Sequence, residues 1–221
     1  MTDIHTVLFD LDGTLADTAP DLGFALNEVL REHGRPPLPQ ECIRPEASHG
    51  ARALLRLGFA VAPGDRDYDA LRRRFLDVYA ANLCRETRLF PGIGALLSAL
   101  ADRGLRWGIV TNKPAFLTRP LVQQLGLAES AACVVSGDTT ANSKPHPGPL
   151  LFACSECHAE PGDCVYVGDA ARDIEAGRTA GMHTLVALFG YLRATDDPPS
   201  WGADALVQSP DEILDWIDAH R

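Results

Sequence analysis

Short apolar runs alternate along this chain with longer stretches in which apolar residues recur every three or four positions. The short runs, rich in Val and Ile, predict buried strands, and the longer pattern predicts amphipathic helices. The predicted strands are Thr6–Phe9, Arg106–Val110, Cys133–Ser136, Cys164–Val167, His183–Ala187 and a short edge strand at Ala205–Val207. The predicted helices are residues 92–103, 114–126, 147–158, 171–180 and 210–219. Strands that alternate with helices indicate an α/β fold on a parallel sheet with helices on both faces.

One interval breaks this alternation. The stretch between the first and the second predicted strand is far longer than an ordinary crossover connection. We therefore predict two domains: a sheet domain of residues 1–18 and 89–221, and an inserted α-helical cap of residues 19–88. The helices predicted in the cap are Asp21–Arg31, Pro39–Arg44, His49–Gly58 and Tyr68–Arg85.

Polar side chains follow four of the predicted strands, at the points where the strands end. Because the carboxyl ends of parallel strands meet at one edge of a sheet, we expect these side chains to lie close together. Each group alone also suits a solvated turn or a helix cap, and Asp-Gly is a common turn dipeptide. The set is Asp10, Asp12 and Thr14 after the first strand, Thr111 and Asn112 after the second, Ser143 and Lys144 after the third, and Asp169 and Asp173 after the fourth.

The chemistry of this set suits a divalent cation and a phosphate group. Asp10, Asp12 and Asp169 supply the hard oxygen ligands that Mg²⁺ prefers. Lys144 can offset the carboxylates and hold a phosphate oxygen; it and Lys113 are the only two lysines, against eighteen arginines. The hydroxyl and amide groups after the second strand can donate hydrogen bonds to the phosphoryl group, and a carboxylate can itself attack phosphorus.

Charge and composition exclude several other classes of function. The net charge of −10 leaves no broad basic face for nucleic acid or an anionic membrane. No signal precedes the first strand and no apolar run is as long as a membrane span, so we expect a cytoplasmic protein. Six cysteines show no disulfide-framework spacing, and the Cys154–Cys157 pair is expected on a buried helix face rather than in a redox or metal site. The oligomeric state is not predicted.

Four motifs give the chain a family resemblance. The segments D-L-D-G-T-L, V-T-N, S-K-P and V-G-D-A-A-R-D resemble, in order, the four motifs of the haloacid dehalogenase superfamily, and the match spans the whole chain. The resemblance implies a Rossmann-like parallel sheet with a helical cap inserted after the first motif. It also implies that Asp10 is a nucleophile and Asp12 a general acid–base.

The same resemblance implies where phosphate and metal bind. Thr111 and Lys144 are implied to bind phosphate, and the Asn112 amide is predicted to add a hydrogen bond. The implied Mg²⁺ ligands are Asp10, the Asp12 carbonyl and Asp169. Asp173 is implied to contact these ligands rather than the metal itself.

The second carboxylate selects among branches of the superfamily. In the dehalogenases the first motif resembles D-x-Y, with no second carboxylate. Asp12 instead favours phosphoryl transfer, in which a leaving oxygen must be protonated. Phosphonate-cleaving relatives use a cap lysine, and residues 19–88 contain none. A sugar-phosphate mutase remains an alternative. A signalling receiver domain is an alternative from another class, although receivers lack a cap and carry their phosphorylated Asp after a middle strand.

The cap segment A-S-H-G-A-R, Ala47 to Arg52, is where the family's cap loop faces the active site. Arg52 is predicted to pair with a substrate carboxylate, and His49 either contacts the substrate or caps a helix. The chain most resembles bacterial phosphoglycolate phosphatases, and S-H-G-A-R-A-L-L-R-L-G-F and W-G-I-V-T-N-K-P also resemble a sub-branch that cleaves N-acetylmuramic acid 6-phosphate. Both substrates carry a carboxylate, so Arg52 does not discriminate between them.

Overall fold

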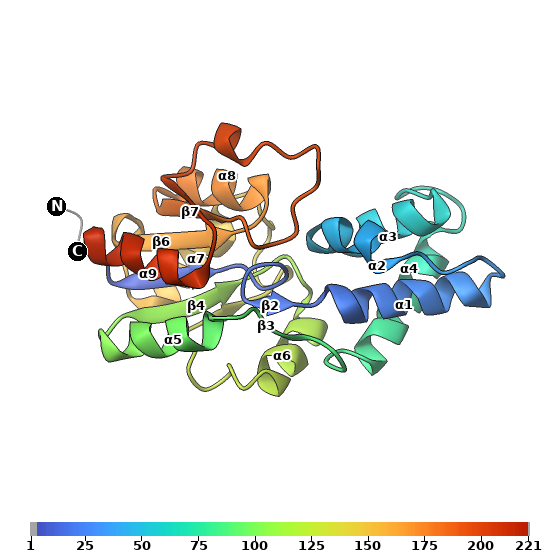
Figure 1. Cartoon of the computed structure of the whole chain (residues 1–221), viewed down its shortest axis with the longest axis horizontal. Helices are drawn as coiled ribbons and strands as arrows, with labels where there is room; N and C mark the ends of the chain where they lie inside the picture. Colours follow the sequence, from blue (N-terminus) through green and yellow to red (C-terminus); the bar gives the residue numbers. More distant parts are fainter. Residues whose placement is uncertain (1–3, 221) are drawn as a thin grey trace.

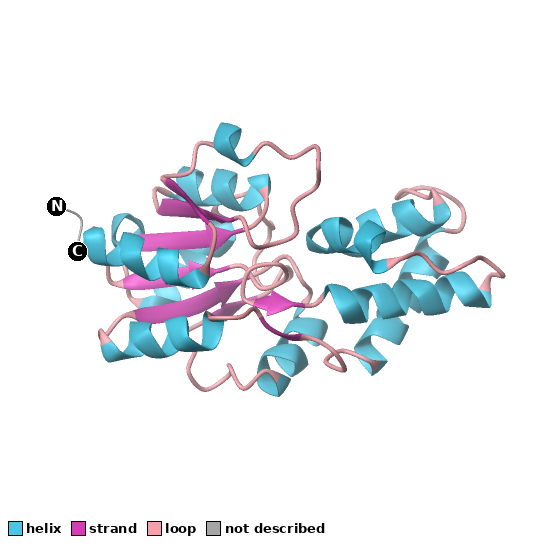
Figure 2. Ribbon diagram, viewed as in Figure 1, coloured by secondary structure: helices cyan, strands magenta, loops and turns pink. Residues whose placement is uncertain are grey.

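A six-stranded parallel sheet forms the centre of the computed structural model, which describes residues 4–220. The strand order is β5-β4-β1-β6-β7-β8 (Figures 1 and 2). This arrangement confirms the predicted α/β class and Rossmann-like parallel sheet. The strands are β1 (Thr6–Phe9), β4 (Arg106–Val110), β5 (Val134–Val135), β6 (Cys164–Gly168), β7 (His183–Ala187) and β8 (Ala205–Val207).

Burial on both faces explains why the central strands read as continuous apolar runs. All four residues of β1 are buried, and β1 pairs with β4 on one side and β6 on the other. Val7 and Phe9 pack into one hydrophobic cluster, whereas Leu8 packs into a second one. The two faces of the sheet therefore each support a layer of helices.

Helices cover the sheet in two layers. On one face α5 (Ile93–Asp102) packs against α9 (Pro210–Ala219), and on the other α7 (Gly148–Cys157) packs against α8 (Ala171–Ala180), as Figure 1 shows. The remaining helix, α6 (Ala115–Gln124), follows β4. Two short 3₁₀ helices, η2 (Pro161–Asp163) and η3 (Pro198–Trp201), lie in the connections before β6 and β8.

The cysteine pair of α7 lies on its buried face, as the sequence suggests. Cys154 and Cys157 do not contact each other through sulfur. The Cys154 Sγ lies 3.6 Å from Cys164 Sγ, and the Cys157 Sγ lies 3.4 Å from Cys133 Sγ. All four thiols are free and buried, and they fill the core beneath α7.

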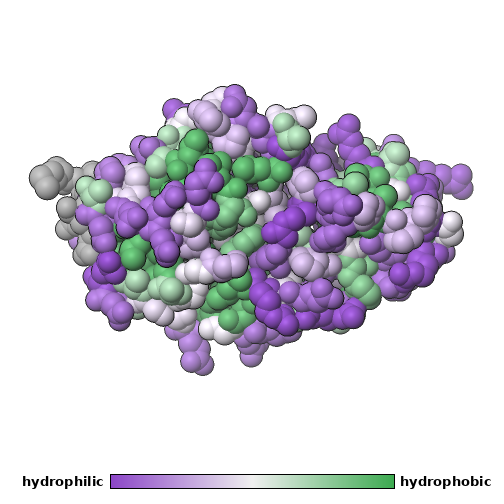
Figure 3. All heavy atoms as spheres, in the orientation of Figure 1, coloured by the Kyte–Doolittle hydropathy of each residue, from purple (hydrophilic) through white to green (hydrophobic). Residues whose placement is uncertain are grey.

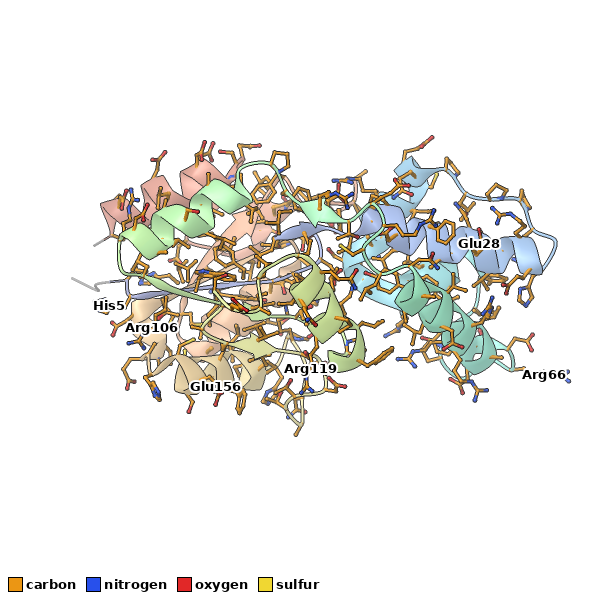
Figure 4. The ribbon with its side chains drawn as sticks, turned by 90° about the horizontal axis from the view of Figure 1, so that it is seen from below. His5, Glu28, Arg66, Arg106, Arg119 and Glu156 are labelled. Atoms are coloured by element: carbon orange, nitrogen blue, oxygen red, sulfur yellow. The ribbon has the colours of Figure 1, made fainter. Side chains whose placement is uncertain are left out.

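The long interval after β1 forms a group of helices at one end of the molecule (Figure 1). Figure 4 shows Arg66 at the outer end of this group and Arg106 at the opposite end of the molecule. Helix α4 packs against α1 and ends at Ala81, earlier than the predicted Arg85. The domain boundaries at residues 18 and 88 stay a prediction. The elements are α1 (Ala19–Glu32), α2 (Gln40–Ile43), the 3₁₀ helix η1 (Arg44–His49), α3 (Gly50–Phe59) and α4 (Tyr68–Ala81).

A small antiparallel ribbon, absent from the sequence prediction, joins these helices to the sheet. It pairs β2 (Ala16–Asp17) with β3 (Arg88–Leu89). Buried Asp21 in the first turn of α1 accepts hydrogen bonds from the Thr87 N and Oγ1 at 2.9 and 2.8 Å and from the Glu86 N at 3.1 Å. The outgoing and returning chains are therefore fastened together where the helical insertion begins and ends.

Candidate active site

The carboxyl end of β1 carries the two aspartates of the first motif. Because β1 is central, Asp10 lies between Thr111, which follows β4, and Asp169, which follows β6. The chain turns sharply at Gly13, where φ is +89°. A Cβ at Gly13 would lie 2.1 Å from the Asp169 Oδ2, so this close approach requires glycine.

Lys144 is the cation at the centre of the site. It is 3% exposed, and its Nζ lies 2.9 Å from the Asp10 Oδ1 and 2.7 Å from the Asp173 Oδ1. The Nζ also donates to the Val110 carbonyl and the Tyr166 hydroxyl, so its position is fixed. Burial acts to raise the pKa of Asp173, but the charges of Lys144 and Arg172 and the hydrogen bond from Lys144 together outweigh it and hold that pKa below the ordinary value.

Protein groups offset the negative charge of the remaining carboxylates only in part: Lys144 forms an ion pair with Asp10, whereas Asp169 forms no ion pair within residues 4–220. Burial raises the pKa of Asp10 against the attraction of Lys144, and burial followed by repulsion from Asp10 and Asp173 raises the pKa of Asp169 to about 8. One oxygen from each of these three residues lies within 4.8 Å of the others. Among residues 4–220, the buried Asp169 Oδ1 has no hydrogen-bond partner. A buried acidic cluster with an unpartnered oxygen fits a divalent cation.

The Asp12 side chain has different partners. Its Oδ1 accepts hydrogen bonds from the Thr18 Oγ1 at 2.6 Å and the Lys113 Nζ at 2.8 Å. The Lys113 Nζ also lies 4.7 Å from the centre of the Tyr79 ring on α4. Burial would lower the pKa of Lys113, but Asp12 and Tyr79 together outweigh it and raise that pKa. Neither Thr18 nor Lys113 was assigned a role from sequence; the scarcity of lysine was the signal for Lys113.

Asn112 holds the loop that carries Lys144. Its Nδ2 donates to the Lys144 carbonyl at 2.9 Å, and its Oδ1 accepts from the Lys144 N at 3.0 Å. The Thr111 Oγ1 accepts a hydrogen bond from the Lys113 N, which leaves its proton available to a ligand. The predicted phosphate contacts of Thr111, Asn112 and Lys144 stay predictions, and for Asn112 the side chain is engaged with the protein.

A cavity of about 970 Å³ opens from Asp10 and Asp12 toward the cap helices. Figure 3 shows hydrophilic side chains gathered along this junction on the face in view. Arg52 and Arg56 on α3 and Arg72 on α4 line the cavity, and none of the three has an ion-pair partner within the described chain. Apolar side chains, including Leu57, Tyr68 and Phe75, form the rest of its cap wall.

His49 also lines the cavity, but a protein group already binds it. Its Nδ1 lies 3.1 Å from the Arg172 Nη1, and burial together with the charge of Arg172 lowers the pKa of His49 to about 4. The ring is therefore neutral near neutral pH, with Nδ1 as the acceptor. Its contact with a substrate stays a prediction. Arg172, which belongs to the segment V-G-D-A-A-R-D, was not singled out from sequence.

The fold and the site define a class of hydrolase. Residues 7–187 match the haloacid dehalogenase-like hydrolase family. The chain belongs to this family, which confirms the resemblance seen in its four motifs and removes the receiver-domain alternative.

Similar proteins narrow the class to phosphatases. The chain is 42% identical over 216 residues to N-acetylmuramic acid 6-phosphate phosphatase of Pseudomonas putida, covering 98% of this chain and 97% of the relative. It is 45% identical over 209 residues to phosphoglycolate phosphatase of Xanthomonas campestris pv. campestris, covering 95% and 94%. A crystal structure of a predicted phosphoglycolate phosphatase from Haemophilus somnus superposes with a TM-score of 0.86 at 26% identity, covering 98% and 99%. These relatives confirm the predicted enzyme class, a phosphatase.

Two further sequence predictions concern the surroundings of the protein. Across the described residues no helix has both the length and the apolar character needed to cross a bilayer. The cytoplasmic location stays a prediction.

Proposed function

We propose that this phosphatase hydrolyses a small phosphate monoester with Mg²⁺ through an aspartyl-phosphate on Asp10. One observation carries the proposal: buried Asp10 lines the cavity, its Oδ1 lies 2.9 Å from the Lys144 Nζ, and it shares with Asp169 and Asp173 a cluster of oxygens within 4.8 Å of one another. A carboxylate in this position can attack phosphorus while a cation holds the phosphoryl oxygens.

The residues divide the reaction between them. Asp10 attacks phosphorus and the bond to the leaving alcohol breaks, while Asp12 gives its proton to the alcohol oxygen. Asp12 then takes a proton from water, and the resulting hydroxide attacks phosphorus, which releases phosphate and restores Asp10. Lys144 and the Thr111 hydroxyl hold the phosphoryl group. Asp10, the Asp12 carbonyl and Asp169 would hold Mg²⁺, which supplies positive charge to the phosphoryl oxygens when it is bound.

We propose phosphoglycolate, a phosphate ester with a carboxylate, as the substrate. The net charge of −10 repels an anion at long range, so positive charge has to be concentrated locally. The arginines at 52, 56 and 72 provide that charge beyond the phosphate site. A guanidinium group pairs with a carboxylate through two parallel hydrogen bonds.

The size of the cavity favours a second candidate, N-acetylmuramic acid 6-phosphate. About 970 Å³ lies at the upper end of the range for small-molecule sites and far exceeds what phosphoglycolate fills. This substrate adds a sugar ring and an acetamido group, for which the apolar wall of the cavity offers a contact. The N-acetylmuramic acid 6-phosphate phosphatase of Pseudomonas putida aligns with 98% of the present chain.

The test is phosphate release from a panel of monoesters with Mg²⁺, including both candidates, sugar phosphates and an aryl phosphate. The proposal expects a kcat/KM for one of the two carboxylated esters well above that for all the others. Isomerisation of a sugar phosphate without release of phosphate would instead identify a mutase. No turnover of any monoester would refute the proposal.

A further inference from the structure

One residue of the cap helices contacts the acidic cluster directly. The 3₁₀ helix η1 places Ser48 over the end of β6, where its Oγ donates a hydrogen bond to the Asp169 Oδ2 at 2.6 Å. The same Oγ lies 3.0 Å from the carbonyl oxygen of Asp12. Ser48 therefore contacts two of the three groups proposed to hold Mg²⁺, although it comes from the inserted helices.

The contact fixes the orientation of the Asp169 carboxylate. Its Oδ2 accepts two hydrogen bonds, one from Ser48 and one from the Tyr191 N at 2.9 Å. Its Oδ1 is buried and has no partner among the described residues. With Oδ2 held by two donors, the carboxylate cannot rotate without losing both, so the unpartnered Oδ1 is also kept in one position.

We propose that Ser48 is a positioning residue for the metal ligand Asp169, so that the cap completes the Mg²⁺ site. Partners that orient metal ligands typically change metal affinity by about 10–100-fold when they are removed. Because binding is reciprocal, bound Mg²⁺ holds η1 against the sheet by the same factor with which Ser48 strengthens Mg²⁺ binding.

Two arginines of the sheet domain hold η1 in place. The Arg172 Nη2 donates to the Ser48 carbonyl at 2.8 Å, and its Nη1 contacts the His49 Nδ1. Arg193 forms an ion pair with Glu46, two residues before Ser48 in η1. Ser48 is thus fixed at its backbone as well as at its hydroxyl, which is what a residue that orients another group requires.

The inference rests on the proposed function through its metal site. The test is calorimetric titration of Mg²⁺ into the intact, substrate-free protein. Ser48→Ala should raise the Kd for Mg²⁺ about 10-fold or more, whereas Ser48→Thr, which keeps the hydroxyl, should recover most of the affinity. Ser155→Ala, at an exposed serine of α7, is the matched control and should bind as the natural protein does.

A second readout separates positioning from damage to the fold. In excess chelator Ser48→Ala should still unfold in one cooperative transition, with a melting temperature lowered by no more than the roughly 2–4 °C that one lost hydrogen bond costs, and its lost activity should return as Mg²⁺ is raised. Hydrogen exchange of residues 44–49 should slow when Mg²⁺ binds to the natural protein, a measurement that needs no variant.

The outcomes separate this inference from the proposed function. Equal Mg²⁺ affinity for Ser48→Ala and the natural protein would overturn the inference alone. A hydrogen-exchange rate of residues 44–49 that is the same with and without Mg²⁺ would also overturn it. A natural protein that hydrolyses phosphate esters without binding Mg²⁺ would overturn the inference and the metal part of the proposed function together.

Discussion

Asp10 and Asp12, which are separated by one residue after the end of β1, have different surroundings. Asp10 faces Lys144 and two further carboxyl groups, whereas the Asp12 carboxylate turns toward Lys113 and Thr18. Asp10 is thereby placed beside the residues proposed to hold phosphate and metal. Asp12 is held on the cavity side, where a leaving group would lie.

Replacing either aspartate should affect different steps. Asp10→Asn should leave only a trace of turnover with the fold intact, because the nucleophile is lost while its shape is kept. Asp12→Asn should slow hydrolysis of an alkyl phosphate by roughly 10²–10⁴-fold, because proton transfer is lost. With an aryl phosphate, which needs no proton on leaving, Asp12→Asn should release a burst of about one phenol per enzyme before turnover slows. Substantial steady turnover by Asp10→Asn would rule out the covalent route.

Arg52 is the residue by which the cap is predicted to select its substrate. Arg52→Ala should reduce kcat/KM for the carboxylated ester by about 2–3 kcal/mol, the scale of a charge-assisted hydrogen bond. An aryl phosphate should be hydrolysed almost as before. Arg66 lies at the outer end of the cap helices in Figure 4. Arg66→Ala is therefore the control and should leave kcat/KM unchanged for both substrates. An equal loss on both substrates would point to impaired closure of the cap instead.

At the scale of elements, the buried carboxylate of Asp21 fastens the segment that leads into β3 to the first turn of α1. Asp21→Ala should lower the free energy of unfolding by about 2–3 kcal/mol, because it leaves the buried Thr87 N without an acceptor. Asp21→Asn keeps one acceptor oxygen and should lose less. Urea unfolding measures both, with Asp69→Ala on the exposed side of α4 as the control. A loss no larger than that of the control would mean that the segment is held by other contacts.

Burial made most strands visible in the sequence, although the partly buried edge strand β8 was also predicted with its observed bounds. Strands β1, β4, β6 and β7 are enclosed by helices or neighbouring strands, so their apolar runs were visible and their bounds were nearly right. The edge strand β5 was predicted as Cys133–Ser136, but only Val134 and Val135 pair with β4. Strands β2 and β3 have two residues each, too few to show any periodicity.

The residues of the candidate site also divide into those that could be predicted from the sequence and those that could not. Residues at the ends of strands could be brought together from sequence, because a parallel sheet gathers its carboxyl ends at one edge. The contacts of Ser48 and Arg172 could not, because they depend on how η1 lies on the sheet. That arrangement joins segments far apart in the chain, and no periodicity or spacing records it.

At the scale of the whole molecule, the incompletely neutralised acids link stability to pH and to metal. The pKa of Asp169 is about 8 in the folded protein against an ordinary 3.8, so the folded state holds this proton more tightly. Its stabilising contribution is complete below pH 3.8 and is lost as pH rises toward 8. The pKa of Asp173 is lowered instead, so its contribution is already constant above neutrality.

In excess chelator, the melting temperature should therefore fall between about pH 6 and about pH 8.5. Mg²⁺ should restore it most at the higher pH, where it no longer has to displace a proton. Ca²⁺ should bind but inhibit, because it prefers a larger and looser set of ligands. Calorimetry across this range, with activity assays in each metal, tests the expectation. Full turnover in chelator would contradict it.

The central position of β1 has a consequence for how the chain folds. Val7 pairs with Trp107 on one side and with Val165 on the other, so the first described strand closes two long loops. Contacts this distant in sequence form slowly, because ordering the intervening chain costs entropy before any pairing rewards it. During synthesis the cap helices emerge from the ribosome long before β4 and β6. Until those two strands are made, the apolar strand β1 has no strand to pair with. Asp10, the proposed nucleophile, thus acquires its surroundings only after most of the chain has been made. An incomplete chain exposes a strand prone to aggregation rather than a partial enzyme.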